Sequence, residues 1–264
     1  MGKCMASPPA SGGQERAVAI IPARYAATRL PGKPIMRDPR GKYIIEYVCQ
    51  AASKAKLIDR VIVATDDKRI FDVVTSLGVA AAMTSDKHPS GSDRIAEVAR
   101  GIAADVVVNI QGDEPQIRPE QIDQVVSLLR EAKDCVVSTL ASRIESPEEL
   151  ADPNVVKVVV DNEWRALYFS RLPIPYVRGA KDQLRESPVP HLHHIGIYGY
   201  RREFLLQYVR LPRPAIEDTE KLEQLRVLAS GYKIKVGLTP YRLIGIDTPA
   251  DFEAFCRQIS SAAT

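Results

Sequence analysis

The stretch Val106-Val-Val-Asn-Ile-Gln-Gly-Asp-Glu-Pro115 joins a short apolar run directly to an acidic turn. Its first five residues are mostly β-branched, which is typical of a strand that is buried on both faces. Similar short runs, separated by stretches of helical periodicity, lie at 18–22, 60–64, 79–83 and 135–140. Strands that alternate with helices predict βαβ units, and therefore an α/β fold with a mainly parallel sheet flanked by helices.

The pattern changes after about residue 143. Two apolar runs at 155–161 and 166–169 are joined by a short polar turn, which predicts an antiparallel pair. A strand, a helix, a strand and a final helix are then expected at 195–200, 218–229, 233–238 and 248–259. No linker separates the halves, so the sequence predicts a single domain over 17–264 with an antiparallel extension that pairs subunits.

Composition and charge exclude several classes of protein. The 36 basic and 33 acidic residues leave a net charge of +3, too small to favour nucleic-acid binding. The four cysteines, Cys4, Cys49, Cys135 and Cys256, lack metal-binding spacing, so we expect reduced thiols in a cytoplasmic protein. No apolar run approaches the roughly 18 residues of a membrane-spanning helix. Residues 1–16 are expected to form a disordered tail rather than a signal peptide.

The loop after the first strand carries three cations, Arg24, Arg29 and Lys33. Ligands of open parallel sheets bind beyond the carboxyl ends of the strands, and a cationic loop there can wrap a polyphosphate. The alternative is a solvated basic loop. Its sequence is neither GxGxxG nor GxxxxGK[ST], which argues against a dinucleotide oxidoreductase and a P-loop NTPase.

Two carboxylates indicate a metal site beside this loop. Asp113 follows the strand at 106–110, next to Gly112, which would let a ligand approach closely. Magnesium in proteins takes one or two carboxylates together with phosphate oxygens and water. Asp247, in the sequence GIDTP, is expected to be the second ligand. The alternatives are an acidic turn for Asp113 and a helix cap for Asp247.

Other polar segments give weaker signals. The helix start Ser90-Gly-Ser-Asp93 can bind a base or phosphate, but it is also an ordinary cap. The histidines of 191–194 lack partners at zinc spacing, which favours a hydrogen-bonding role beside an anionic substrate. Arg171 can bind a carboxylate. Glu223 and Gln224 lie in a predicted amphipathic helix, where a solvated face is the alternative.

Seven segments together resemble the 3-deoxy-manno-octulosonate (Kdo) cytidylyltransferases, also called CMP-Kdo synthetases. They are IPARYAATRLPGKP (21–34), HPSGSDR (88–94), VNIQGDEP (108–115), ALYFSRLPIPY (166–176), HIGIYGYR (194–201), EKLEQLR (220–226) and GIDTP (245–249). The resemblance implies a Rossmann-like nucleotidyltransferase fold, a homodimer and a magnesium cofactor. It also implies that the chain uses CTP to activate Kdo, giving CMP-Kdo and pyrophosphate for lipopolysaccharide or a related polysaccharide.

The resemblance also implies roles for single residues. The nucleotide would be bound by Arg24, Arg29, Lys33, Ser90, Gly91, Asp93 and Gln111. The acidic sugar would be bound by Arg171, His194, Tyr198, Glu223 and Gln224, within a sugar-binding and dimerisation part at about 155–230. Asp113 and Asp247 would hold magnesium and, with Arg24 and Lys33, form the catalytic group. The sequence departs from the family at Ala27, Tyr43 and Ser92, where Ser, Pro and Thr are usual.

Two alternative functions stay open on the sequence alone. A cytidylyltransferase for 8-amino-Kdo or sialic acid would share the basic loop and differ only in its contacts to the sugar. A non-catalytic sensor of CTP or a nucleotide sugar is the second alternative. The presence of both Asp113 and Asp247 favours an enzyme, because a sensor has little use for a metal at the α-phosphate.

Overall fold

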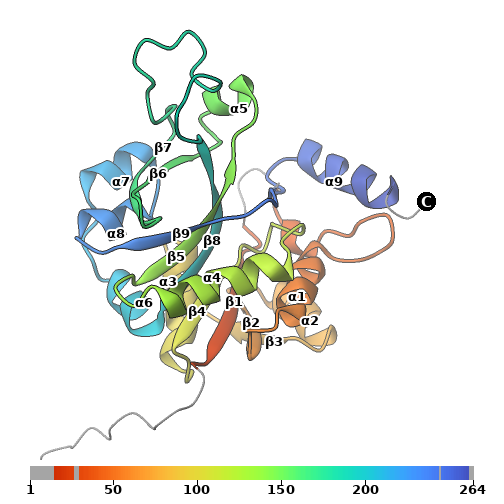
Figure 1. Cartoon of the computed structure of the whole chain (residues 1–264). Coiled ribbons are helices and arrows are strands. Elements are labelled where there is room, and N and C mark those ends of the chain that lie inside the picture. The colour runs from red at the N-terminus through yellow and green to blue at the C-terminus, as the bar shows by residue number, and fades with distance from the viewer. Residues whose placement is uncertain (1–14, 27–29, 244, 262–264) are drawn as a thin grey trace, which may run out of the picture.

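The computed structural model describes residues 15–26, 30–243 and 245–261, and its strands form one mixed sheet (Figure 1). Most of the expected tail thus lies outside the described residues. Among the described residues the strands are β1 (Ala17–Ala23), β2 (Arg60–Thr65), β3 (Ala80–Met83), β4 (Val106–Asn109), β5 (Val137–Arg143), β6 (Lys157–Val160), β7 (Ala166–Ser170), β8 (Leu192–Arg201) and β9 (Ile234–Leu238). The helices are α1 (Ile44–Lys54), α2 (Lys68–Ser76), α3 (Gly91–Arg100), α4 (Pro119–Glu131), α5 (Pro147–Ala151), α6 (Arg202–Tyr208), α7 (Ala215–Glu220), α8 (Leu225–Ala229), α9 (Pro249–Ser261) and the short 3-10 turn η1 (Lys33–Ile35).

The strand order confirms the predicted fold class. The main path of the sheet runs β3-β2-β1-β4-β8-β5-β9. The β1–β2, β1–β4, β2–β3 and β5–β9 pairs are parallel, whereas β8 is antiparallel to both of its neighbours on this path. Among the described residues no helix is long and apolar enough to cross a bilayer.

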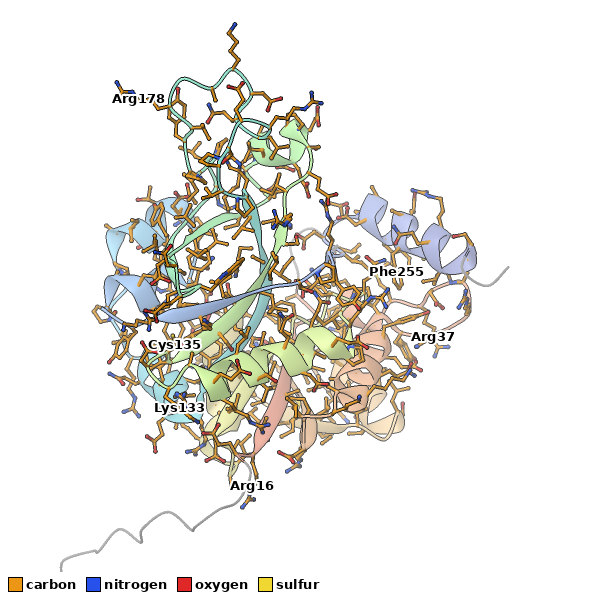
Figure 2. All side chains as sticks on the ribbon, viewed as in Figure 1. Arg16, Arg37, Lys133, Cys135, Arg178 and Phe255 are labelled. Carbon is orange, nitrogen blue, oxygen red and sulfur yellow. The ribbon has the colours of Figure 1, made fainter. Side chains whose placement is uncertain are left out.

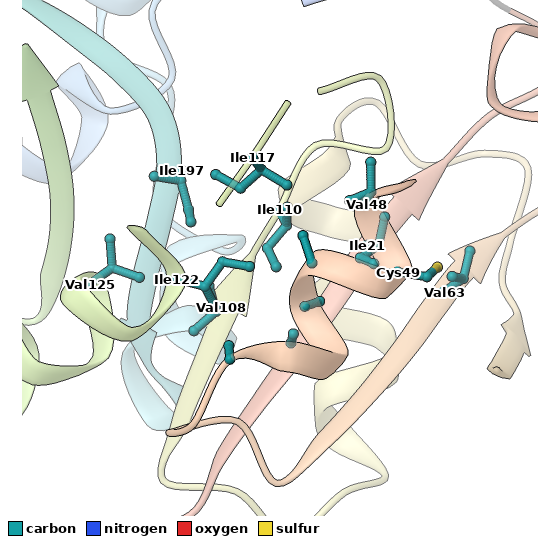
Figure 3. Close-up of a cluster of buried hydrophobic side chains, with 14 of the residues drawn as sticks. Ile21, Val48, Cys49, Val63, Val108, Ile110, Ile117, Ile122, Val125 and Ile197 are labelled. Carbon is teal, nitrogen blue, oxygen red and sulfur yellow. The ribbon is translucent and has the colours of Figure 1, made fainter. Parts of the chain in front are cut away.

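Strand β4 shows why the run at 106–108 is continuously apolar. Val106 and Val108 belong to the hydrophobic cluster under α1 and α4, whereas Val107 belongs to the cluster on the opposite face with α3 and α6. All three are fully buried. Figure 3 shows the first cluster, in which Val108 lies near Ile122 of α4. Because side chains of a strand alternate between faces, a strand covered by helices on both sides needs apolar residues at every position.

The predicted antiparallel pair is present as β6 and β7. Strand β6 also pairs with β8, so the pair is continuous with the main sheet. The segment between β7 and β8 projects beyond the end of the sheet, and Arg178 lies near its tip (Figures 1 and 2). This segment exposes three large apolar side chains, Leu172, Tyr176 and Val189.

The single helix expected over 218–229 is wrong, because the chain forms α7 and α8 with a break between them. Lys221 adopts a left-handed conformation with φ of 52°. The Glu220 carboxylate accepts hydrogen bonds from Ser170 Oγ at 2.8 Å and the Arg171 backbone N–H at 3.0 Å, which fixes the end of α7. These long-range contacts override the local helical periodicity, which cannot reveal them.

Candidate active site

The site lies where the parallel strands β1 and β4 end side by side. Ile20 of β1 pairs with Asn109 of β4, so the loops that follow the two strands emerge at the same edge. One loop carries Arg24 and Lys33, and the other carries Gln111 and Asp113. The sequence-based expectation that these loops meet is confirmed by a cavity that both of them line.

Two adjoining cavities occupy this edge. The first cavity, of about 290 Å³, is lined by Pro22, Ala23, Arg24, Ala26, Lys33, Pro34, Gly91, Gln111, Gly112 and Asp113. The second cavity, of about 350 Å³, is lined by Gly91, Ser92, Asn109, Gln111, Asn154, Val156, His193, His194, Gly196, Tyr198, Tyr200, Lys221, Leu222, Glu223 and Gln224. Gly91 and Gln111 line both, so ligands in the two cavities would meet at these residues.

Lys33 brings together the two carboxylates that the sequence singled out. Its ammonium donates hydrogen bonds to Asp113 Oδ2, to Asp247 Oδ1 at 3.1 Å and to the Ile246 carbonyl at 3.0 Å. Burial alone would lower the pKa of Lys33, but the charges of Asp113 and Asp247 raise it. A charged ammonium therefore lies between two oxygen atoms that come from distant parts of the chain.

The acidic pair has the composition of a magnesium site. One oxygen of Asp113 and one of Asp247 contact the same cation, the Lys33 ammonium. Among the described residues there is no cluster of three or more histidine, cysteine, aspartate or glutamate side chains suited to a metal. Two carboxylates beside a cavity suit magnesium, which completes its coordination with phosphate oxygens and water.

Glu114 adds a carboxyl group to which the sequence analysis gave no role. Its side chain is half-buried, and burial together with the charges of Asp113 and Asp247 raises its pKa to about 8. Its Oε2 atom has no hydrogen-bond partner among the described residues. Its Oε1 atom lies against Gly196 of β8, where an added Cβ would stand 3.3 Å away.

Gly112 serves the packing of the turn itself. A Cβ at this position would lie 2.9 Å from the Pro22 carbonyl oxygen at the end of β1, which is closer than such atoms approach. The expectation assigned this glycine to close approach of a ligand. The structure gives a different reason for the glycine: the turn at 111–113 packs directly against β1, and a side chain at this position would prevent that contact.

The predicted nucleotide residues divide into two groups. Arg24, Lys33, Gly91 and Gln111 line the first cavity, and Arg24 donates a hydrogen bond to the His88 carbonyl at 3.1 Å. Ser90 and Asp93 line neither of the two cavities. Ser90 Oγ instead caps α3, accepting from the Asp93 backbone N–H at 3.3 Å and donating to its carboxylate at 2.8 Å. Arg29 lies outside the described residues.

Four of the five predicted sugar residues line the second cavity: His194, Tyr198, Glu223 and Gln224. The fifth, Arg171, is absent from this wall. Its guanidinium donates to the Glu220 carbonyl at 2.7 Å and the Pro153 carbonyl at 2.9 Å. Arg171 thus ties the chain after α7 to the loop before β6, and both segments border the cavity.

Comparisons with known proteins identify the family of this chain. The sequence profile of the cytidylyltransferase family matches residues 18–234. A 3-deoxy-manno-octulosonate cytidylyltransferase of Trichlorobacter lovleyi is 46% identical over 239 residues, which cover 89% of this chain and 94% of the relative. That of Thermodesulfovibrio yellowstonii is 48% identical over 244 residues, covering 89% and 95%. The chain belongs to the 3-deoxy-manno-octulosonate cytidylyltransferase family.

A search of solved structures finds a member of the same family with a similar fold. A CMP:2-keto-3-deoxy-manno-octonic acid synthetase in complex with CTP is 41% identical and superposes with a TM-score of 0.87, covering 94% of this chain and 99% of that one. A 4-diphosphocytidyl-2C-methyl-D-erythritol synthase from Anaerococcus prevotii is 15% identical with a TM-score of 0.61, so it shares the fold alone.

The sequence analysis gave no role to several residues of this cytidylyltransferase's second cavity, among them Asn109, Tyr200 and Lys221. Asn109 is buried at the end of β4, and its Oδ1 atom has no hydrogen-bond partner among the described residues. Tyr200 and Lys221 also line the wall. All three lie inside motifs quoted in the sequence analysis. A polar residue in an otherwise apolar strand is the signal that could have found Asn109.

Proposed function

We propose that this chain is the enzyme that transfers CMP from CTP to Kdo, with release of pyrophosphate. The observation that carries the proposal is the pair of adjoining cavities, which share Gly91 and Gln111. The first is cationic on one side through Arg24 and Lys33, as a triphosphate requires. The second is lined by hydrogen-bonding side chains, as a polyhydroxylated sugar requires.

The proposed reaction is an in-line displacement. The anomeric hydroxyl oxygen of Kdo bonds to the α-phosphorus of CTP, the bond from that phosphorus to the oxygen bridging to the β-phosphate breaks, and pyrophosphate leaves with those electrons. In this proposal the hydroxyl proton passes to water. Positioning two anionic substrates and neutralising their charge then supply most of the catalysis.

Magnesium is the cofactor we propose, with Asp113 and Asp247 as its protein ligands. When bound there, a divalent ion would neutralise phosphate charge and lower the pKa of the attacking hydroxyl. Lys33 would then be released from the carboxylates to bind a phosphate oxygen. Arg24 lines the first cavity and donates to the His88 carbonyl in the loop before α3, and it would orient the same triphosphate.

We also propose a homodimer that works in the cytoplasm and supplies CMP-Kdo for lipopolysaccharide. The exposed side chains of Leu172, Tyr176 and Val189 support the dimer, because apolar groups gathered on a projecting segment favour protein contact. Cross-linking or light scattering tests it. A purely monomeric protein at micromolar concentration would contradict it.

Pyrophosphate release, measured with CTP and magnesium and with Kdo, 8-amino-Kdo or sialic acid as acceptor, tests the function. The proposal predicts release with Kdo and little with the other two. Release with another acid sugar would retain the mechanism and change the substrate. Binding of CTP without release for any sugar would favour the sensor.

A further inference from the structure

Thr139 is a buried residue of β5 whose hydroxyl contacts three polar atoms of β8. Its Oγ1 atom lies 3.0 Å from His194 Nε2, 3.1 Å from the Ile195 carbonyl oxygen and 2.8 Å from the Ile197 carbonyl oxygen. Thr139 has no exposed surface, and it was given no role by the sequence analysis.

An irregularity in β8 creates this cluster. Thr139 pairs with Tyr198, but the next residue, Leu140, pairs with Ile195. Gly196 and Ile197 are therefore extra residues on β8, and the strand bends around the Thr139 side chain. Bulges of this kind change the direction of side chains beside functional sites. Here His194 and Tyr198, on either side of the bulge, both line the second cavity.

The proton count decides which nitrogen of His194 carries hydrogen. A hydroxyl has one proton, and carbonyl oxygens can only accept. If Thr139 donated its proton to Nε2, its oxygen would have no proton left for the carbonyl oxygens of Ile195 and Ile197, and the lone pairs of the three oxygens would repel one another. The favourable arrangement directs the proton to a carbonyl and lets Thr139 Oγ1 accept a hydrogen bond from Nε2–H.

The imidazole of His194 is neutral at physiological pH. The side chain is buried, and burial lowers its pKa to about 3, with a smaller contribution from the neighbouring His193. A neutral ring with a proton on Nε2 has an unprotonated Nδ1. In the part of the chain that the structure describes, no hydrogen bond is made by Nδ1, and the ring is packed edge-on against Phe169 with centroids 4.9 Å apart.

We propose that Thr139 is a positioning residue that holds His194 in the Nε2–H tautomer, so that Nδ1 accepts a hydrogen bond from a sugar hydroxyl in the second cavity. This inference rests on the proposed function only for the identity of the ligand. A lone pair at this position selects a hydroxyl donor and repels a carboxylate. The acid group of the sugar must therefore lie elsewhere in the cavity, whose one lining ammonium among the described residues is Lys221.

The tautomer is tested directly by the nitrogen chemical shifts of the His194 imidazole in the ligand-free, full-length protein. We expect a protonated-type signal for Nε2 and an unprotonated-type signal for Nδ1. A protonated Nδ1 would overturn the inference. This spectrum requires neither a variant nor a substrate, so its outcome is independent of whether Kdo is the sugar.

Variants then test the consequence for the sugar. Thr139→Val keeps the shape and removes the hydroxyl, and we expect the KM of the sugar to rise about tenfold, as for loss of one hydrogen bond, while the KM of CTP stays within about twofold. Thr139→Ser should restore the wild-type KM and tautomer. Equal changes in both KM values, or no rescue by serine, would indicate a general structural role and overturn the inference.

Ser138→Ala is the matched control. Ser138 is the neighbouring buried residue of β5, and its hydroxyl donates to the Val125 carbonyl at 2.6 Å, in the core and away from both cavities. It should lower stability without changing the KM of the sugar. If the protein proves to use a different acid sugar, the KM of that sugar is measured instead. If it uses none, the proposed function fails while the spectrum still decides the tautomer.

Discussion

The Lys33 ammonium lies 3.1 Å from Asp247 Oδ1 while it also donates a hydrogen bond to Asp113. One cation of the first loop thus neutralises two carboxylates, one after β4 and one just before α9. These carboxylates are the pair that we propose for magnesium. In the ligand-free protein Lys33 compensates charge that the metal would compensate in the complex.

Replacing Lys33 tests this compensation. In Lys33→Met the two carboxylates repel each other beside the half-buried Glu114, so the variant should unfold at a lower temperature than the wild type. A loss of about 1 kcal/mol corresponds to roughly 2–4 °C in a chain of this size. Magnesium should then raise the melting temperature of the variant more than that of the wild type. Lys68→Met, at an exposed pair on α2, is the control, and equal shifts in both proteins would contradict the account.

Asp113→Asn should abolish turnover and preserve the fold. The contact that joins this residue to the Ile246 backbone uses the Asp113 carbonyl, so the side-chain change leaves it intact. We expect kcat to fall by roughly a thousandfold, as for loss of a group that neutralises transition-state charge. Circular dichroism should be unchanged. Near wild-type activity in the folded variant would refute the metal assignment, and Asp72→Asn on the exposed face of α2 controls for loss of charge.

The buried pair of Glu217 and Arg226 should be essential to the shape of the second cavity. Arg226 Nε donates to Glu217 Oε2 at 2.7 Å, and this pair joins α7 to α8 across the break that presents Glu223 and Gln224. Arg226→Met removes the buried partner of this carboxylate and leaves it the half-exposed Arg213, 4.0 Å away. Loss of a buried partner typically costs about 3–5 kcal/mol.

Urea unfolding of Arg226→Met and of the double variant with Glu217→Leu measures this cost. The double variant should recover much of the lost stability, because no buried charge of the pair is left. A loss below about 1 kcal/mol in the single variant would mean that the pair is not a buried ion pair in solution.

The lowered pKa of His194 predicts part of the loss in the free energy of unfolding at acidic pH. Its folded pKa of about 3 lies below the ordinary value of 6.5, so below pH 6.5 the unfolded chain binds a proton that the folded protein does not. Stability contributed by the neutral ring is therefore present above pH 6.5 and is lost as pH falls toward 3. The slope is about 1.4 kcal/mol per pH unit. Between pH 6.5 and about 5, His194→Gln should lose about 2 kcal/mol less than the wild type, and parallel stability curves would contradict the pKa.

The local sequence pattern was sufficient to predict those parts of the site whose place follows from the direction of the strands. The βαβ alternation placed Asp113 and the cations of the first loop at one edge of the sheet, because parallel strands end together. It also predicted a strand over 106–110 from its mostly apolar run, and the structure has β4 at Val106–Asn109, where residues of both faces are buried.

The local sequence pattern could not predict those features whose conformation depends on contacts between segments distant in sequence. The bulge at Gly196, the left-handed Lys221 and the bonding of Arg171 to carbonyls all depend on segments distant in sequence. Thr139 was invisible for the same reason, since its partners lie on β8 and only the register between the strands brings them together. The roles of the nucleotide, sugar and metal residues remain predictions that the variants above test.

The fate of the anomeric oxygen tests the central claim most directly. Kdo that carries a heavy-oxygen label at its anomeric hydroxyl is incubated with CTP, magnesium and the enzyme, and the products are analysed by mass spectrometry. The account predicts CMP-Kdo and pyrophosphate in equal amounts, with the label in the bond between sugar and phosphorus and none in the pyrophosphate. Unchanged CTP bound to the protein, or label in the pyrophosphate, would contradict it.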